Sequence, residues 1–598
     1  MSTKKDNKKI VILGSSHTGH DSSAAILEDG IPVAHVEVER YTGTKYNLYN
    51  DVDQTEPIQY LDFYDLEKVS YVVHQNWHGH KEGGLRYLNK VRENPDIGAK
   101  GVNQRQKDSV RQTPNKEIRN FLKKEEIKFI YPGHHQCHAA NAFFSSNFDE
   151  ALIITADGGG GNCVLDDDGA YLNSSYVSIM ERRLGTNDYP YRQNEDSGTA
   201  FTVWYGKDNK IFPLRVSNRE ELNIGSAWSQ VAQVAFPTKW FGKEGTIMAL
   251  VAHGQNEALV SAQYQIDKNC FSKPGLNGKN VMIRQLLKNS RRSQYPVSSL
   301  ANFAWALQNA TNDIFELTIS EYFKHFKTRN VCISGGVALN CLMVGKMYEI
   351  FDDIDIFIPP VPYDAGLSIG AAQFVYHQML ENDRIKWDDH PTPYLGKMYS
   401  VEEIKKAIKD YKKDNIEVLE CEDEDIIECI KSQKIVAVFN ERSESGRRAL
   451  GNRSILADPR SSTMKNIIND RVKHREKYRP FAPSILREEV KNWFERDVDS
   501  PYMNVVLKFK EEIVDLVPAV VHEDNSARLH TVTEKGNKWY YNFLKKWKNE
   551  TGIPILLNTS FNDREPIVET PEDAMKSFLR TAIDCLYFPQ AKLVLKKK

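Results

Sequence analysis

The sequence lacks the features that define several protein classes. None of its apolar runs, within 598 residues, is long enough to span a bilayer. Its eight cysteines form neither a CxxC pair nor a dense framework, as expected for reduced thiols. A formal net charge of −2 supplies no overall basic field for nucleic acid. These absences argue against a membrane-spanning or disulfide-stapled protein, and nucleic-acid binding is not the default expectation.

The N-terminus also lacks the apolar region of a signal peptide. The polar, lysine-rich stretch from Met1 to Lys9 leads directly into the strand-like run Ile10 to Gly14. We therefore expect a cytoplasmic protein. One segment, Lys90 to Lys124, is richer in Lys and Arg than in acids. A solvated face is its simpler interpretation, and contact with nucleic acid is the alternative.

What the sequence has is the length and composition of a two-domain globular protein. Hydrophobic residues make up 40% and charged residues 27% of the chain. A chain of 598 residues exceeds what one hydrophobic core usually organises. The sequence becomes polar between Asn382 and Lys397, where Pro391, Pro393 and Gly396 mark a domain boundary. We predict an α/β protein with domains at residues 1–385 and 386–598.

A strand, a polar turn and a hairpin turn follow one another twice in the first domain. The hairpin turn of the first copy is Asp29-Gly30. The second copy begins at Ala151, and its hairpin turn is Asp168-Gly169. Such a duplication suggests the actin-like ATPase fold, in which two ribonuclease-H-like halves hold a nucleotide between them.

Periodicity predicts further elements. An amphipathic helix spans Leu300 to Phe326, and the strand Val331 to Ser334 then leads into Gly335-Gly336 and another helix, a geometry that lets a phosphate approach the backbone. In the second domain we predict helices over Val401 to Tyr411 and Pro571 to Leu579, and strands over Ile435 to Phe439 and Pro554 to Leu557.

Three histidines lie within five residues, at positions 134, 135 and 138. The Ala and Phe content around them predicts a helix, on which His134 and His138 share one face and can reach a single metal ion. Asp364, between a strand-like run and a Gly-rich helix start, is the candidate third ligand. Ordinary hydrogen-bonded histidines are the alternative, and two histidines with one carboxylate also suit a non-haem iron oxygenase.

Three short phrases in the second domain are dense in cations, at residues 442–454, 473–484 and 522–531. Arginine forks bind phosphate oxygens bidentately, and lysine adds a mobile point charge. Gly, Pro, Ala, Ser and Phe are interleaved with these cations, which favours a buried anion site over a solvated surface.

Six phrases, in chain order, resemble the O-carbamoyltransferase family, which includes nodulation-factor, cephamycin, tobramycin and saxitoxin-pathway enzymes. They are HDSSAA from His20, HHxxHA from His134, SGGVALN from Ser334, RALGxRS from Arg448, RPFAP from Arg479 and LNTSFN from Leu557. The resemblance implies an actin-like ATPase-fold domain followed by a YrdC-like α/β domain.

The resemblance also implies a two-site mechanism. Carbamoyl phosphate and ATP, with Mg²⁺, would give carbamoyl adenylate and pyrophosphate in the YrdC-like domain. A hydroxyl acceptor would then attack the adenylate in the first domain, beside a divalent metal such as iron(II). A homodimer is compatible with the sequence, and no membrane partner is expected.

The resemblance to the O-carbamoyltransferases implies a role for individual residues of this sequence. His134, His138 and Asp364 would hold the metal ion, and His20 is the candidate general base, a neutral imidazole near its ordinary pKa. The resemblance implies that carbamoyl phosphate and the ATP phosphates are bound by Arg448, Lys473, Arg479, Arg528 and Asn558. It implies that the nucleotide cleft is lined by Asp157, Gly159, Gly335, Gly336 and Asn340.

Four phrases depart from the family pattern: two lie in the first domain, and the other two are at Gly446 to Arg448 and Asn562 to Pro566. Between Val38 and Lys45 only Lys45 remains of a basic cluster, and we count it with His20 as a candidate catalytic residue. Thr246 replaces the lysine of a second phrase. The acceptor therefore stays open between a small-molecule hydroxyl and a hydroxymethylated nucleobase in a nucleotide or DNA. A tRNA threonylcarbamoylation-type enzyme and a non-catalytic nucleotide-binding scaffold are further alternatives.

Overall fold

The structure is a computed structural model. It describes residues 9–16, 20–47, 56–75, 128–130, 132–160, 199–218, 222–236, 242–257, 297–411 and 415–597. The basic segment Lys90 to Lys124 and the predicted turn Asp168-Gly169 lie outside these residues. Among the described helices, none is both long enough and apolar enough to cross a membrane.

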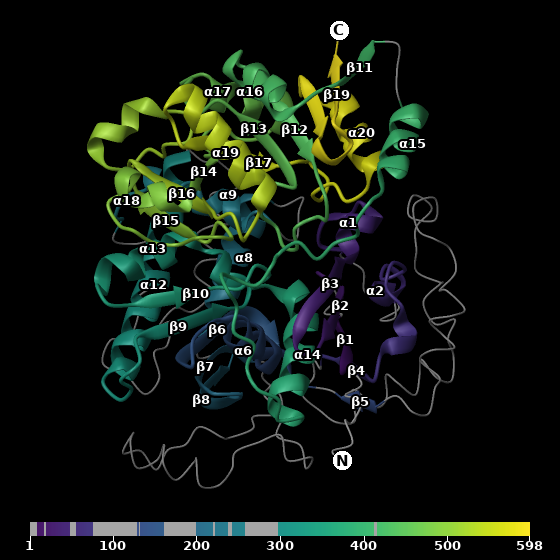
Figure 1. Ribbon diagram of the computed structural model, residues 1–598. Coiled ribbons are helices and arrows are strands. Elements are labelled where there is room, and N and C mark those ends of the chain that lie inside the picture. Colours follow the sequence, from purple (N-terminus) through teal and green to yellow (C-terminus); the bar gives the residue numbers. More distant parts are fainter. Residues whose placement is uncertain are drawn as a thin grey trace. The chain divides into compact units, whose positions relative to one another are not determined.

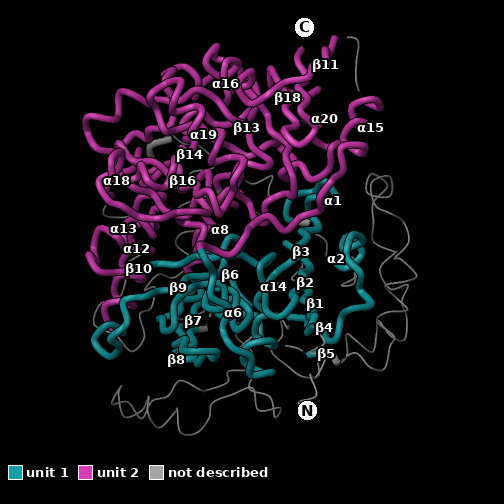
Figure 2. The backbone as a smooth tube through the Cα atoms, in the orientation of Figure 1, with its two compact units in different colours: residues 1–223, 322–337, 355–388 teal, residues 224–321, 338–354, 389–598 magenta. Residues whose placement is uncertain are grey.

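The chain forms two compact units that alternate along the sequence (Figure 2). Unit 1 comprises Met1–Asn223, Tyr322–Val337 and Asp355–Asp388. Unit 2 comprises Ile224–Glu321, Ala338–Ile354 and Asp389–Lys598. The final passage from unit 1 to unit 2 falls inside the predicted boundary region, and the two-domain division at residues 385 and 386 stays a prediction.

The first sheet of unit 1 has the strand order β3-β2-β1-β4-β5. Its strands are β1 (Val11–Ser16), β2 (Ser23–Glu28), β3 (Ile31–Glu37), β4 (Tyr71–His74) and β5 (Lys128–Ile130). Strands β1, β2 and β3 pair antiparallel, whereas β1 with β4 and β4 with β5 pair parallel. Two short helices accompany this sheet, α1 (Val38–Thr42) and α2 (Glu56–Gln59).

The second sheet of unit 1 repeats this arrangement (Figure 1). Its strands are β6 (Glu150–Gly160), β7 (Thr199–Lys207), β8 (Lys210–Asn218), β9 (Asn330–Ser334) and β10 (Asp355–Phe357). The order is β8-β7-β6-β9-β10, antiparallel from β8 to β6 and parallel from β6 to β10. The repeated strand order confirms a duplication in unit 1, whereas the second predicted hairpin turn, Asp168-Gly169, lies outside the described residues.

The first predicted hairpin is also confirmed. Strands β2 and β3 pair through Glu28 and Ile31, leaving Asp29 and Gly30 as a two-residue loop. Their φ angles of 47° and 84° are both in the left-handed region, which suits a tight turn between twisted strands. In the second copy the structure shows a hairpin between β7 and β8, across Asp208 and Asn209, that the sequence analysis did not predict.

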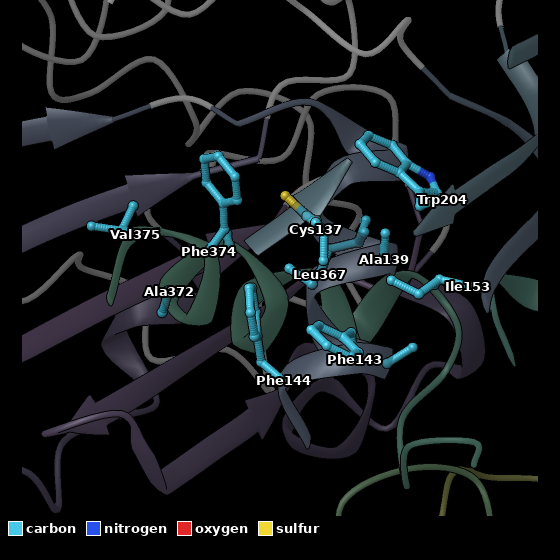
Figure 3. Packing of buried hydrophobic residues seen from close by; sticks show 14 of the residues in the cluster. Cys137, Ala139, Phe143, Phe144, Ile153, Trp204, Leu367, Ala372, Phe374 and Val375 are labelled. Atoms are coloured by element: carbon cyan, nitrogen blue, oxygen red, sulfur yellow. The ribbon is translucent and has the colours of Figure 1, made fainter. Parts of the chain in front are cut away.

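Two helices form the core of unit 1 between its sheets. Helix α6 (His134–Ser145) packs on β6 and β9, helix α14 (Leu367–Phe374) packs on β1 and β2, and the two helices pack on each other. A Cβ atom on Gly370 would lie 1.9 Å from the carbonyl oxygen of Cys137, so only glycine allows this approach. Figure 3 shows Phe143, Phe144 and Phe374 among the apolar side chains of this core. The histidine-bearing helix is thus packed closely against α14.

Unit 2 is built on a nine-stranded mixed sheet with the order β11-β19-β18-β12-β13-β17-β14-β16-β15. The strands are β11 (Ile416–Glu420), β12 (Val436–Phe439), β13 (Arg453–Ala457), β14 (Ala482–Leu486), β15 (Val505–Lys508), β16 (Ser526–Val532), β17 (Ile555–Ser560), β18 (Cys585–Phe588) and β19 (Leu593–Lys597). Strands β12 with β18 and β14 with β16 are parallel, and the other pairs are antiparallel.

The helices of unit 2 come from both halves of the sequence. The earlier ones are α8 (Ile224–Ala235), α9 (Glu244–Met248), α13 (Cys341–Ile350) and most of α12 (Val297–Phe323). The later ones are α15 (Val401–Tyr411), α16 (Asp423–Lys431), α17 (Met464–Ile468), α18 (Val490–Trp493), α19 (Lys538–Thr551) and α20 (Pro571–Arg580). The predicted helices at α12, α15 and α20 and the predicted strands at β12 and β17 are confirmed.

Candidate active site

The two predicted metal-binding histidines lie at the start of α6. The helix begins at His134, and the Gln136 side chain accepts a hydrogen bond from the Gly133 N–H at 3.2 Å, which satisfies one N–H before the helix. His134 and His138 are four positions apart and share a helix face, as predicted. A Cβ on Gly160 would lie 2.2 Å from the His134 ring, so the end of β6 approaches closely only because residue 160 is glycine.

Two carboxylates meet these histidines in unit 1. Asp157 Oδ2 lies 3.2 Å from the Nε2 atoms of both His134 and His138. Asp364, in the short 3-10 helix Asp364–Gly366, places Oδ1 3.7 Å from His134 Nε2 and 3.4 Å from His138 Nε2. One ligand atom from each of the four side chains lies within 4.8 Å of the others. The structure therefore brings together the three predicted ligands and adds Asp157.

The donor set fits a divalent metal ion. Two imidazole nitrogens and two carboxylates are ligands that iron, zinc and similar ions accept. Asp364 Oδ2 is buried and accepts no hydrogen bond from the described residues. His20 Nε2, 3.7 Å from this oxygen, is too far to donate a hydrogen bond to it. A buried carboxylate oxygen is costly without a cation or a close donor. These residues can therefore hold a metal ion, and the donor set does not choose among the candidate metals.

The pKa values of Asp157 and His138 in this cluster are shifted from their ordinary values. Burial would raise the pKa of Asp157, but hydrogen bonds from His134 and His138 outweigh it and hold that pKa well below its usual range. Burial opposes charge on His138 as well, yet its contacts with Asp157 and Asp364 raise its pKa to about 9. The carboxylates thus attract positive charge to the imidazoles, which is the electrostatics a bound cation would also exploit.

The middle histidine has a structural role. His135 Nδ1 lies 2.7 Å from the Thr155 hydroxyl, and its Nε2 lies 3.0 Å from the Thr199 carbonyl oxygen. Burial and the charge of His134 hold its pKa well below its usual range. Because both ring nitrogens are engaged, His135 fits the ordinary hydrogen-bonded alternative.

Asp157 connects the metal cluster, our name for the four candidate ligands His134, His138, Asp157 and Asp364, to the predicted nucleotide cleft. Its Oδ1 accepts hydrogen bonds from the N–H groups of Gly158 at 2.7 Å and Gly336 at 3.4 Å. Gly335 has a φ of 91°, and its N–H donates to the Pro362 carbonyl oxygen at 2.7 Å. Two of the predicted cleft glycines therefore lie beside the metal cluster.

The other two cleft residues have different settings. Gly159 lies near the end of β6 with a φ of 152°. Asn340 belongs to unit 2, where its side chain accepts from the Met343 N–H at 3.0 Å to cap α13 and donates to Gln308 at 2.9 Å. Its amide is thus used for structure in unit 2.

His20 lies beside the metal cluster. Its Nε2 is 3.7 Å from Asp364 Oδ2, and its Nδ1 is 3.1 Å from Asp21 Oδ2. Burial opposes its charge, but Asp21 and Asp364 raise its pKa to about 9. The sequence analysis predicted that the His20 imidazole has a pKa near its ordinary value. With the charges of Asp21 and Asp364 beside it, that pKa is instead raised. Lys45, the second candidate catalytic residue, is exposed in the 3-10 helix Lys45–Asn47.

In unit 2 the charges of Arg475, Arg479 and Arg528 affect one another, and the predicted anion site stays a prediction. Burial and the nearby charges of Arg479 and Arg528 hold the pKa of Arg475 well below its usual range. Burial also lowers the pKa of Arg528, and the charge of Arg479 adds to this effect. Arg528 Nε makes no hydrogen bond with the described residues. Three like charges held this close favour an anion among them.

Arg475 was not singled out from the sequence. It donates from Nε to Asn469 Oδ1 at 2.7 Å and from Nη2 to the Pro480 carbonyl oxygen at 3.1 Å. These bonds hold the chain on either side of Arg479. Its position four residues before Arg479 was the available signal, but the spacing alone does not show that the two charges meet.

The remaining anion-site candidates differ in their surroundings. Arg448 donates to the Leu339 carbonyl oxygen at 3.3 Å. Lys473 Nζ contacts four oxygens of Ser560 and Asn562, at 2.5 to 3.2 Å. Lys473 therefore fixes the segment that follows Asn558. Asn558 itself is buried and donates to the Ala449 carbonyl oxygen at 3.0 Å.

Two family models match most of the chain. "Carbamoyltransferase N-terminus" matches residues 11–373, and "Carbamoyltransferase C-terminus" matches residues 427–596. The chain belongs to the carbamoyltransferase family. It is accordingly a transferase, as the six sequence phrases predicted.

Curated relatives of this carbamoyltransferase extend over most of its length. An uncharacterised protein of Synechocystis sp. is 31% identical, covering 96% of this chain and 95% of that protein. Nodulation protein NolO of Bradyrhizobium diazoefficiens is 31% identical over 76% of this chain and 77% of its own. Nodulation protein NolNO of Sinorhizobium fredii is 28% identical over 95% and 78%, respectively.

Solved structures show only distant likeness to the carbamoyltransferase. Thermococcus kodakarensis HypF is 11% identical, covering 62% of this chain and 48% of that one, with a TM-score of 0.33. Component A of (R)-2-hydroxyglutaryl-CoA dehydratase from Acidaminococcus fermentans is 13% identical, covering 62% and 99%, with a TM-score of 0.33. TM-scores this low support no conclusion about the fold of this chain.

Proposed function

We propose that this carbamoyltransferase is an ATP-dependent O-carbamoyltransferase. It would use ATP and water to convert carbamoyl phosphate to carbamoyl adenylate with release of phosphate and pyrophosphate, and then transfer the carbamoyl group to a hydroxyl acceptor with release of AMP. The acceptor is a small-molecule hydroxyl or a hydroxymethylated nucleobase in a nucleotide or DNA. We assign the two sheets of unit 1 to an actin-like ATPase fold, and their repeated strand order supports this assignment. We assign residues 386–598 to a YrdC-like domain. Magnesium would accompany ATP.

The observation that carries the proposal is the cluster of buried His134, His138 and Asp364 with partly buried Asp157. These residues would hold a divalent ion, for which iron(II) is our choice. Such an ion would neutralise phosphate charge on the adenylate and polarise its carbamoyl group. Asp157 also accepts from the Gly336 N–H, so the same carboxylate would position the nucleotide cleft relative to the ion.

The arginines of unit 2 supply the other half of the proposal. Arg448, Arg479 and Arg528 would bind carbamoyl phosphate and the ATP phosphates through charge-assisted hydrogen bonds. Arg475 adds charge, while its own donors are used on Asn469 and Pro480. Lys473 would act by fixing Ser560 and Asn562 beside Asn558. We assign adenylate formation to this cluster.

Proton transfer from the acceptor hydroxyl is assigned to His20. The imidazole can accept that proton only when it is neutral. Because Asp364 contributes to the raised pKa of His20, a cation shared with Asp364 would offset that charge and favour the neutral ring. Lys45 stays a second candidate near the acceptor.

Two alternatives fit the structure less well. An iron oxygenase with two histidines and one carboxylate needs open coordination positions, and Asp157 adds a fourth protein ligand. That enzyme would also leave the arginine cluster of unit 2 without a function. A tRNA threonylcarbamoylation-type enzyme normally has its two domains on separate chains, and complementation of tRNA modification would test it.

The direct test incubates the full-length protein with carbamoyl phosphate, ATP, Mg²⁺ and a panel of hydroxylated acceptors. We expect pyrophosphate release that depends on carbamoyl phosphate, and an acceptor mass gain equal to one carbamoyl group replacing hydrogen. Absence of pyrophosphate release with every acceptor and metal would contradict the proposal.

A further inference from the structure

A serine hydroxyl lies behind one of the two imidazoles of the metal cluster. Ser334 is the last residue of β9, and its Oγ lies 3.3 Å from His138 Nδ1. The other ring nitrogen, His138 Nε2, is the atom that faces Asp157 and Asp364. Ser334 and His138 both have a relative exposure of 0%, so their contact is shielded from bulk water.

The pairing of two strands places this hydroxyl behind the ring. Strand β9 runs parallel to β6 and brings Ser334 level with Thr155, which is two residues before Asp157. Helix α6, which carries His138, packs on both strands. In sheets of this kind the carboxyl ends of parallel strands are where ligands bind. One sheet edge therefore supplies both a candidate ligand and the hydroxyl behind another.

A second hydrogen bond fixes the direction of the first. The Ser334 hydroxyl lies 3.0 Å from the Pro362 carbonyl oxygen, which can only accept a hydrogen bond. A hydroxyl has one hydrogen to donate, so that hydrogen goes to Pro362 and a lone pair of Oγ faces the ring. His138 Nδ1 must then carry a hydrogen and donate it to Ser334. The opposite direction would leave lone pairs of two oxygens facing each other.

A hydrogen held on Nδ1 leaves the lone pair of Nε2 for a cation. When an ion replaces the hydrogen on Nε2, the imidazole is neutral and keeps one N–H, whose hydrogen-bond partner determines which nitrogen binds the metal. The carboxylates act in the opposite sense, because Asp157 Oδ2 at 3.2 Å and Asp364 Oδ1 at 3.4 Å attract a hydrogen to Nε2. An acceptor at Nδ1 counters that attraction.

The same hydroxyl connects His138 to the segment that carries a second candidate ligand. Pro362 lies two residues before Asp364. Its carbonyl oxygen accepts from the Ser334 hydroxyl and, at 2.7 Å, from the Gly335 N–H. The end of β9 therefore contacts both the histidine ring and the backbone that leads to the carboxylate.

We propose that Ser334 is a positioning residue of the metal cluster. Its hydroxyl accepts from His138 Nδ1 and so holds the ring in the orientation and tautomer in which Nε2 binds a divalent ion. Ser334 acts through His138 and not on the ion itself. The assignment rests on the proposed function, in which this cluster binds the ion, and extends it to the residue behind the ligand.

Metal affinity in the absence of any substrate tests the assignment. We expect full-length Ser334→Ala to bind Co²⁺ about 10- to 100-fold more weakly than wild type in a competition titration with a chromophoric chelator. Ser334→Thr keeps the hydroxyl and should restore most of the affinity. Equal affinities of wild type and Ser334→Ala, equally weak binding by Ser334→Thr, or a wild type that binds no Co²⁺ would each overturn the proposal.

Ser146→Ala is the matched control. Ser146 directly follows α6, and its buried hydroxyl donates to the Phe143 carbonyl oxygen at 2.7 Å. This variant also loses one buried hydroxyl beside the same helix, and it should bind Co²⁺ as wild type does. If Ser334→Ala does not fold, Ser334→Cys replaces it, because a thiol of similar shape is a weaker acceptor and should also lower the affinity.

The ring hydrogen provides a readout that a merely structural role would not move. In protein saturated with Co²⁺, each ligating imidazole should give one paramagnetically shifted N–H signal in the proton NMR spectrum. In Ser334→Ala one of these signals should exchange with D₂O at least about tenfold faster than in wild type, because its hydrogen bond is gone. Unchanged exchange of every such signal would overturn the proposal.

The proposed function can fail separately. Co²⁺ binding that depends on the Ser334 hydroxyl, without carbamoylation of any acceptor, would contradict the reaction and leave the role of Ser334 standing. Carbamoylation by wild type, with equal Co²⁺ affinities of wild type and Ser334→Ala, would leave the reaction standing and reject the role of Ser334.

Discussion

At the scale of single residues, Arg528 makes a sharp test of the anion cluster. Its guanidinium is close to two other arginines, and its Nε has no protein partner among the described residues. Removing it should weaken phosphate binding by about 2–5 kcal/mol, so Arg528→Ala should abolish measurable pyrophosphate release at ordinary carbamoyl phosphate concentrations. A coupled pyrophosphate assay measures this.

Arg580→Ala is the matched control for that experiment. Arg580 is 55% exposed and forms a surface ion pair with Glu565 in the same unit. Such pairs contribute little, so this variant should keep wild-type release. Normal release by Arg528→Ala would remove Arg528 from the anion site.

Titration of the histidines predicts how stability depends on pH. His20 and His138 have pKa values raised to about 9, from an ordinary value of 6.5. The folded state binds these two protons more tightly than the unfolded state does. The protonated histidines therefore contribute fully to the free energy of unfolding below about pH 6.5, and this contribution is lost as the pH rises through about 9. The melting temperature of chelator-treated protein should therefore fall between pH 7 and 9.5.

His138→Gln should show a smaller fall over the same range, because one of the two titrating groups is gone. Calorimetry of both proteins, each treated with chelator, makes the comparison. Identical pH slopes would show that His138 is not protonated in the folded metal-free protein.

The sequence predicted three of the four side chains that cluster as candidate metal ligands, and it assigned the fourth, Asp157, to the nucleotide cleft. The i, i+4 spacing of His134 and His138 reveals a shared helix face because both lie on one element. Asp157 lies on a strand, and only the packing of α6 on β6 brings its carboxylate to the histidines. Local spacing carries no signal for such a contact.

At the scale of secondary-structure elements, Arg384 holds the C-terminal end of α6. Its guanidinium donates to the carbonyl oxygens of Phe143 and Ser146 at 2.7 Å and Phe148 at 3.0 Å. It also lies 4.0 Å from the centre of the Phe143 ring. A cation at this end of a helix pairs carbonyl groups that the helix leaves unpaired.

Arg384→Met should therefore lower the free energy of unfolding by about 2–4 kcal/mol, because several carbonyl oxygens lose a charged donor. Lys386→Met is the control: Lys386 is 51% exposed and pairs with Asp149, which is 82% exposed, so its loss should cost at most about 1 kcal/mol. Denaturant unfolding measures both. Equal effects of the two changes would contradict the assigned role of Arg384.

Elements with strong local signals were predictable, and others were not. The Asp29-Gly30 turn was found because both residues tolerate the left-handed conformation that the hairpin requires. Asp208-Asn209 forms a comparable turn without a glycine, so it gave a weaker signal. The helices at α12 and α15 were found from their apolar periodicity.

At the scale of the whole molecule, a duplication in unit 1 was predictable because a strand followed by a hairpin signal occurs twice in the sequence, but the position of the second hairpin at Asp208 and Asn209 was not. The nine-strand order of unit 2 was not, because it depends on pairings between strands far apart, such as β11 with β19. The inclusion of α12 residues and α13 in unit 2 was not predictable for the same reason.

The central claim is that adenylate formation belongs to the arginine cluster and carbamoyl transfer to the metal cluster. His138→Ala tests it by removing one of four candidate metal ligands, which typically lowers metal affinity at least about tenfold. The arginines bind phosphate without that ion. The variant should therefore keep pyrophosphate release while losing bound metal and acceptor carbamoylation.

The decisive measurement determines pyrophosphate release, acceptor carbamoylation and metal content in parallel for wild type and His138→Ala. Phe144→Leu, a conservative change in the apolar core on the same helix, controls for disturbed packing. Chelated wild type with Mg²⁺ restored should show the same split as His138→Ala. The account predicts continued pyrophosphate release without carbamoylated product; full transfer by His138→Ala, or wild-type metal content, would contradict it.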